Sequence, residues 1–203
     1  MTSSGKRRTD PERTQNRRNQ VLDAAAVCFA RSGFHGASMS EISKQAGMSA
    51  GHIYNYFDGK DAIILAFVER EAEHVAGLLG DLASREDPLQ AMLDDAAFHV
   101  DETLDPQPWH LPLEMYAEAS RNPVIAAKLR ENDDISRAKL RELVKLGRKR
   151  RNLPVDDLLL DGRIDTIISY FQGLQIRALH RTDMNRASLV DAFRISMRAL
   201  LMT

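Results

Sequence analysis

Residues Ser38–Lys60 read SMSEISKQAGMSAGHIYNYFDGK, which predicts two short helices joined by a tight turn. Ser38 is followed three residues later by Glu41, the capping-box signature of a helix start. Gly47 then supplies the turn, and Ser49 is a suitable N-cap for the second helix. Two helices in this arrangement form a helix-turn-helix, a motif that reads DNA in many proteins and also occurs in plain helical bundles.

The second of these helices has an apolar side and a polar side at a period of 3.6 residues. The apolar side consists of Ala50, Ile53 and Phe57, and the opposite side of Gly51, His52, Asn55 and Tyr56. The first set can pack on the rest of the protein, whereas the second set can contact a groove of DNA. The alternative is an ordinary solvated helix face.

Segments on both sides extend the helical pattern. Upstream, RTQNRRNQVLDAAAVCFARSGFHGAS has apolar residues at helical spacing and places Gly33 where a helix C-cap glycine is expected. Downstream, YFDGKDAIILAFVEREAEHV makes an Asp-Gly turn and continues as a long amphipathic helix. We expect the upstream helix to brace the other two.

The order of these segments resembles the N-terminal domain of the TetR (tetracycline repressor) family. The resemblance covers roughly residues 17–77 and is carried by LDAAAVCFARSGF, SMSEISKQAGMSAGHIYNYF and FDGKDAIILAF. It implies an all-α protein with a three-helix helix-turn-helix head and a helical ligand-binding and dimerisation body, about nine helices in all. The implied DNA-contact residues are Arg17, Ser38, Ser49, Ala50, Gly51, His52, Tyr54, Asn55, Tyr56 and Lys60.

The resemblance assigns roles to several of these residues. Tyr54 is similar to a family tyrosine whose ring packs while its hydroxyl meets a phosphate, and Lys60 matches the family's lysine at the start of the fourth helix. Ser38 could bind a phosphate at a helix N-terminus or act only as a cap. Many relatives carry a longer side chain where this chain has Gly51, and Asn55 suits either adenine or a phosphate, so the operator sequence stays undetermined.

Charge and composition agree with this interpretation. The 203 residues allow one or two domains, and the formal net charge is −1. Residues 1–60 nevertheless carry nine Lys or Arg against five Asp or Glu, so a basic head joins an acidic remainder. The longest apolar run, AIILAFV, is too short to cross a membrane, and one cysteine excludes an intramolecular disulfide. We therefore expect a cytoplasmic protein.

We divide the chain into a flexible basic tail (1–12), a DNA-binding domain (13–60, with the family domain extending to about 77) and a body (61–203). The two last helical segments, about 156–180 and 186–202, have more apolar surface than one neighbouring helix would cover. Pairing with a second subunit would cover it. In the resembled family the last two helices form a four-helix dimer interface, so we expect a homodimer through these segments.

The body carries residues that in the resembled family surround a ligand cavity, although large apolar residues are often plain core. The candidates are Phe67, Phe98, His99, Trp109, Glu114, Tyr116, Tyr170, Phe171 and Gln175. The three polar ones lie among apolar neighbours, where burial obliges them to find partners, and a ligand could be that partner. We expect a small, largely apolar effector, and Glu114 would favour a cation or a hydrogen-bond donor.

No pattern supports catalysis. The six histidines show no metal-ligand spacing, and there is no nucleophile–base pair or phosphate loop, so we expect no metal, no cofactor and no enzyme. The expected function is a ligand-responsive repressor of transcription, released from palindromic operator DNA by a small molecule. The alternatives are a regulator controlled by a protein partner, an activator, and a helical metabolite-binding enzyme or carrier. The basic run Arg148–Arg151 fits a helix C-terminus better than a second nucleic-acid surface.

Overall fold

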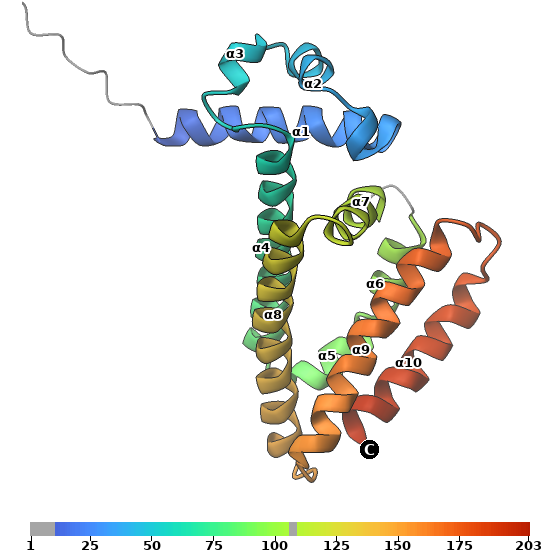
Figure 1. The fold of residues 1–203 in the computed structure, drawn as a ribbon. Coiled ribbons are helices and arrows are strands. Elements are labelled where there is room, and N and C mark those ends of the chain that lie inside the picture. Colours follow the sequence, from blue (N-terminus) through green and yellow to red (C-terminus); the bar gives the residue numbers. More distant parts are fainter. Residues whose placement is uncertain (1–10, 106–108) are drawn as a thin grey trace, which may run out of the picture. The chain divides into compact units, whose positions relative to one another are not determined.

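The computed structural model describes residues 11–105 and 109–203, which form ten α-helices and no β-strand (Figure 1). The predicted all-α fold class is confirmed, with one helix more than expected. The described residues pack as two compact units. The first contains the chain up to Val68 together with Glu114–Ala126, and the second contains the remainder. All but the last two residues of the predicted tail lie outside the described residues.

The first unit is built around the predicted helix-turn-helix. Its complete helices are α1 (Pro11–Gly36), α2 (Met39–Ala46) and α3 (Ala50–Ile53), and it includes parts of α4 (Lys60–Ser84), α7 (His110–Ala119) and α8 (Pro123–Arg150). The boundaries between the two units fall inside α4, α7 and α8, so each of these three helices contributes residues to both units.

Local signals in the sequence set the starts and ends of these helices. The Ser38 hydroxyl accepts from the Glu41 N–H at 3.1 Å, and the Glu41 carboxylate accepts from the Ser38 N–H at 2.8 Å, so the predicted capping box is present. Gly47 ends α2 in the left-handed conformation, with φ 63°. At Gly33 the backbone leaves the helical region with φ 68° and ψ 169°, which bends α1 before its last turn.

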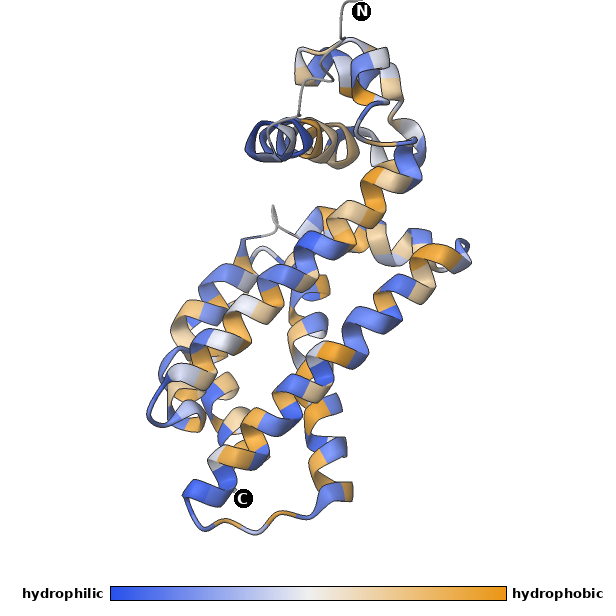
Figure 2. Ribbon diagram, turned by 90° about the vertical axis from the view of Figure 1, so that its left-hand side faces the viewer, coloured by the Kyte–Doolittle hydropathy of each residue, from blue (hydrophilic) through white to orange (hydrophobic). Residues whose placement is uncertain are grey.

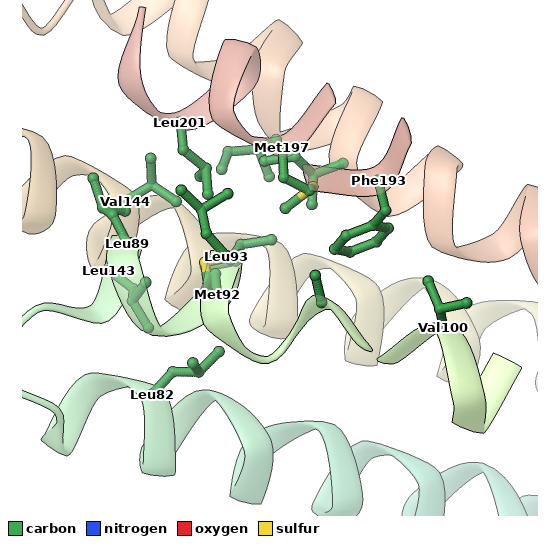
Figure 3. Close-up of a cluster of buried hydrophobic side chains, with 14 of the residues drawn as sticks. Leu82, Leu89, Met92, Leu93, Val100, Leu143, Val144, Phe193, Met197 and Leu201 are labelled. Atoms are coloured by element: carbon green, nitrogen blue, oxygen red, sulfur yellow. The ribbon is translucent and has the colours of Figure 1, made fainter. Parts of the chain in front are cut away.

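The second unit has a continuous apolar core (Figure 3). Its complete helices are α5 (Pro88–Asp94), α6 (Ala96–Leu104), α9 (Asp157–Ala178) and α10 (Arg186–Met202). Leu82 of α4, Met92 of α5 and Met197 of α10 belong to one cluster of buried side chains. Leu89 and Met197 are fully buried, and burying a side chain of this size contributes about 1.5–3 kcal/mol to folding.

One arginine of the basic run lies in this core. Arg148 is buried and donates hydrogen bonds to the carbonyl oxygens of Pro154, Leu201 and Thr203 at 2.8–3.1 Å. Burial and the neighbouring charge of Arg163 lower the pKa of Arg148. The guanidinium therefore ties the end of α8 to the end of α10, a role that the helix-dipole interpretation did not include.

A glycine in α8 permits close packing against α5. A Cβ on residue 147 would lie 2.5 Å from Cγ of Leu89, which is fully buried and has no room to withdraw. We expect Gly147→Ala to destabilise the protein by about 1–2 kcal/mol, because overpacking outweighs the better helix propensity of alanine. Denaturant unfolding measures this difference. Gly80→Ala in α4, where a Cβ meets no atom within 4 Å, is the control, and we expect it to be stabilising.

The long helices are amphipathic, and Figure 2 shows hydrophilic and hydrophobic residues alternating along them. In the part of the chain that the structure describes, no helix combines the length and the apolar character needed to cross a membrane.

Charged pairs link α8 to α9: Arg141 contacts Asp161 and Asp157 at 2.7 Å, and Lys145 contacts Asp157 at 2.9 Å. These pairs lower the pKa of Asp157 and fix α9 along α8.

Candidate functional site

The segment that follows the turn has one buried and one exposed side, as its sequence predicts. The prediction was wrong for Ala50, which was expected to pack with Ile53 and Phe57 but is exposed at the first position of α3. Ser49 caps α3 by accepting from the His52 N–H at 3.3 Å, and helical turns continue beyond α3 because the N–H groups of Tyr56 and Phe57 donate to the Ile53 carbonyl. Ile53 and Phe57 are buried. The opposite side of this recognition segment, residues 49–57, is exposed at Ser49, Ala50, Gly51, His52, Tyr54 and Asn55.

His52 and Tyr56 form a stacked pair on this exposed side. Their rings lie 5.5 Å apart with an angle of 20° between planes, and His52 Nε2 is 3.2 Å from the Tyr56 hydroxyl. Residues four apart on a helix are neighbours, which explains the stacking. The pair restricts the rotamers of both side chains before any ligand binds, so less conformational entropy is lost on binding.

Arg18 of α1 holds the end of the recognition segment, although the sequence pattern did not single it out. Its guanidinium donates to the Tyr56 carbonyl at 2.8 Å and lies 4.4 Å from the ring centroid of Phe57. Gln20 donates to the Ala46 carbonyl at the end of α2. Such contacts join residues 26–38 positions apart, and only their place on the inner face of α1 could have indicated them.

Lys60, the family's lysine at the start of α4, turns toward the end of α1. Its ammonium lies 2.7 Å from the carbonyl oxygens of Phe34 and Ala37. The His35 carbonyl is 3.3 Å away, and the Phe34 ring centroid 4.9 Å away. All three ammonium hydrogens have acceptors within the protein, so these contacts already occupy a lysine that the resemblance places among the DNA-contact residues.

We expect Lys60→Met to lower the stability of the first unit by about 1–2 kcal/mol, because three helix-end carbonyls lose a charged donor. DNA affinity should then fall equally for all sequences. Thermal unfolding and the salt dependence of binding distinguish two roles. A capping lysine leaves the slope of log K against log salt unchanged, whereas a phosphate contact would make it shallower by about 0.9 per lysine.

The remaining predicted DNA contacts differ in their exposure and in their hydrogen bonds within the protein. Arg17 donates to the Gln20 side chain at 2.7 Å and is part-buried. Ser38 is exposed at the start of α2, where its hydroxyl is occupied by the capping box. The Tyr54 ring is half-exposed. These side chains are therefore available to DNA to different degrees.

In the second unit, four predicted or neighbouring rings gather between α6, α9 and α10. Phe193 of α10 lies 5.6 Å from Tyr170 and 5.4 Å from Phe171, centroid to centroid. His99 of α6 lies 5.6 Å from Phe171 and 6.4 Å from Phe193. Burial lowers the pKa of His99, and the carboxylates of Glu102 and Asp95 only partly oppose this effect. Phe193 was not among the residues that the sequence suggested for a ligand site.

Of the other candidates in the second unit, Phe98 lies edge-on to His99 of this cluster, with ring centroids 5.7 Å apart. Phe98 is 55% exposed, and the Trp109 indole donates to the Thr103 carbonyl at 3.2 Å. Gln175 lies on α9 and is half-buried.

Three candidates lie in the first unit instead of the second. Phe67 is buried there edge-on to Phe29, and Tyr116 is half-exposed. Glu114 accepts from the Phe34 N–H at 2.7 Å, so its hydrogen-bond partner is a backbone group of the protein. The sequence had left a ligand as the possible partner of this carboxylate.

Over residues 11–105 and 109–203, no three His, Cys, Asp or Glu side chains gather as a metal-binding group. Cys28 is buried in the first unit, where burial raises the pKa of its thiol and disfavours reactivity.

The arrangement as a whole is a helix-turn-helix whose second element turns hydrogen-bonding side chains outward. It defines a DNA-binding regulator of transcription.

Comparison with known proteins identifies the family. Residues 21–67 match the model of bacterial regulatory proteins of the tetR family. The HTH-type transcriptional repressor Rv1474c of Mycobacterium tuberculosis is 30% identical over 173 residues, which cover 75% of this chain and 83% of that protein. The chain belongs to the tetR family, whose members are transcriptional regulators and not enzymes.

Solved structures share the fold. Salmonella enterica GusR superposes with a TM-score of 0.76 at 24% identity, over 96% of this chain and 98% of that one. The transcriptional regulator FadR from Bacillus subtilis, in complex with stearoyl-CoA, has a TM-score of 0.72 at 19% identity, over 91% and 97%. At these identities the likeness establishes the architecture.

Proposed function

We propose that this chain forms a homodimer that represses transcription from a two-fold symmetric operator and is released by a small, largely apolar molecule. The observation that carries the proposal is the recognition segment, in which Ile53 and Phe57 are buried while His52 and Asn55 are exposed. A helix with an outward polar side can enter the major groove of DNA, where base pairs are distinguishable.

We assign different roles in DNA binding to the side chains of the recognition segment and its neighbours. We assign base reading to His52, Asn55 and Tyr56, whose groups can donate to or accept from base edges. Ser38, Ser49, Tyr54 and Arg17 are assigned to phosphates, with Ala50 and Gly51 allowing close backbone approach. Lys60 is assigned to positioning, because its ammonium caps the end of α1.

The proposed dimer interface is the outer side of α9 and α10, which run side by side (Figure 1). Leu158 on α9 is 84% exposed and Ile195 on α10 is 70% exposed, with Leu159 and Ile176 also half-exposed. Apolar side chains so exposed on adjacent helices favour burial against a second copy. Repressors of the family act as dimers, which supports this interface.

The proposed effector site is the aromatic cluster around Phe193. Rings of Tyr170 and Phe171 would contact an apolar body. The lowered pKa of His99 favours the neutral imidazole, which has one donor and one acceptor for a polar group of the effector. Gln175 is a second candidate for that contact. The B. subtilis FadR complex with stearoyl-CoA gives a precedent in the fold for a ligand with a long apolar chain.

Selection from a random duplex library tests the DNA-binding part. We expect enrichment of a sequence with two inverted half-sites, spaced about one turn or 34–36 Å apart, because a two-fold dimer requires them. A selected duplex without a dyad, or no enrichment, contradicts the proposal. Fatty acyl-CoA and aromatic carboxylates can then be titrated into the complex. An effector weakens DNA binding, and by linkage the duplex weakens effector binding by the same factor.

A further inference from the structure

Two side chains on the exposed side of the recognition segment share a hydrogen bond that leaves part of each available to DNA. The rings of His52 and Tyr56 are stacked with centroids 5.5 Å apart, and His52 Nε2 lies 3.2 Å from the Tyr56 hydroxyl. Over residues 11–105 and 109–203, no carboxylate, ammonium or guanidinium group forms an ion pair or hydrogen bond with the exposed His52 ring. DNA can therefore reach the second ring nitrogen, Nδ1, and the remaining valence of the hydroxyl.

The neutral pair offers a base one donor and one acceptor. A neutral imidazole has one N–H and one acceptor nitrogen, and a tyrosine hydroxyl has one hydrogen and can also accept. Since one of these two hydrogens lies between Nε2 and the hydroxyl, only the other is left for DNA. Either Nδ1 accepts while the hydroxyl donates, or Nδ1–H donates while the hydroxyl accepts.

A proton on the imidazole changes this pattern. Both ring nitrogens of an imidazolium are donors, so Nε2–H donates to the Tyr56 oxygen and Nδ1–H donates outward. The hydroxyl hydrogen is then also directed outward. The protonated pair therefore offers two donors and a positive charge. Histidine is the side chain whose charge ordinarily changes between about pH 5 and pH 8, whereas a tyrosine hydroxyl keeps its hydrogen in this range.

Base edges in the major groove distinguish the two patterns. Adenine presents one acceptor, N7, and one donor, the N6 amino group, whereas guanine presents two acceptors, N7 and O6. One donor with one acceptor matches adenine, and two donors match guanine. The phosphates are the charged groups that face His52 in a complex, and their negative potential favours the protonated form.

We propose that His52 and Tyr56 form a pH-dependent base reader, whose preference shifts from adenine to guanine when His52 takes up a proton. This inference rests on the proposed function, because it names the bases that the recognition segment reads. The neighbouring Asn55 carries an amide, which has donors and an acceptor at every pH of interest. Asn55 therefore sets a fixed part of the sequence preference, and the pair sets the variable part.

The test is selection of a random duplex library by the full-length protein in parallel at about pH 5.5 and about pH 8, on either side of the range in which histidine changes charge. We expect guanine at low pH at a half-site position where adenine is enriched at high pH. Fluorescence anisotropy then measures the affinities of the selected duplex and of its adenine-to-guanine variant at both pH values. The ratio of the two affinities should change by at least about fivefold per half-site, the lower value for a good base contact.

Two variants assign the change to His52. His52→Gln keeps one side-chain acceptor and a donor group but takes up no proton, so it should prefer adenine at both pH values. His35→Gln is the matched control, because it removes an exposed histidine of the first unit that lies 2.8 Å from Glu118 and outside the recognition segment. It should shift its preference as the wild type does. Thermal unfolding at both pH values confirms that each variant is folded.

Three results would overturn the inference while leaving the proposed function in place. The first is a wild-type protein with the same ratio of affinities at both pH values. The second is an equal gain on selected and scrambled duplexes at low pH, which would assign the charge of His52 to phosphates. The third is a shift that persists in His52→Gln. If no duplex is enriched at either pH, the proposed function itself fails and the inference falls with it.

Discussion

Replacing Ile195 with glutamate is expected to convert the dimer to monomers and to abolish high-affinity operator binding. Ile195 is 70% exposed near the middle of α10, on the surface assigned to the interface. A two-fold interface contains each substitution twice, so two carboxylates would be buried without partners. An uncompensated buried charge usually costs about 3–5 kcal/mol, which corresponds to more than a hundredfold in the dimer dissociation constant. Analytical ultracentrifugation measures the dissociation constant.

Loss of the dimer carries over to DNA because two half-sites are bound together. A monomer contacts one half-site, and losing the second contact commonly reduces overall affinity by about 10²–10⁴. Ile135→Glu is the control, because Ile135 is a half-exposed isoleucine of α8, away from α9 and α10 in the chain. It should leave the dimer and DNA binding intact. A dimeric Ile195→Glu protein would assign the interface to another surface.

The structure shows which features the sequence could predict. The helix starts at Ser38 and Ser49 and the turn at Gly47 followed from residues within four positions of one another, and the structure has all three. Capping and left-handed turns depend on local hydrogen bonds and backbone preference, so a short window of sequence contains the needed information. The family resemblance supplied the order of the elements.

Contacts between residues far apart in the sequence could not be predicted from such a short window. Lys60 lies 23–26 positions from the carbonyls that it caps, and Glu114 lies 80 positions from Phe34. A lysine at a helix start and a carboxylate among apolar neighbours each fit several partners, and only tertiary packing selects one. Arg148 is a further example, since its carbonyl partners Pro154 and Leu201 come from a loop and from the end of α10.

The recognition segment leads to the second large expected effect. Asn55→Ala should cost about 1–3 kcal/mol per half-site on the selected duplex if Asn55 reads a base, and about 2–6 kcal/mol in the dimer, which has two half-sites. Binding to a scrambled duplex should change little. His52→Ala should behave similarly, with an additional loss because Tyr56 is then no longer held by the ring stack.

Tyr56→Phe separates reading from orientation in this pair. It keeps the ring that stacks on His52 and removes only the hydroxyl, which lies 3.2 Å from His52 Nε2. If His52 reads a base and the hydroxyl only orients it, the loss on the selected duplex should be smaller than for His52→Ala, about 0.5–1.5 kcal/mol per half-site. Competition binding with single-base variants of the duplex measures the loss of binding free energy for each protein variant. Equal losses on selected and scrambled DNA would reassign His52 and Asn55 to phosphates, because backbone contacts carry no sequence information.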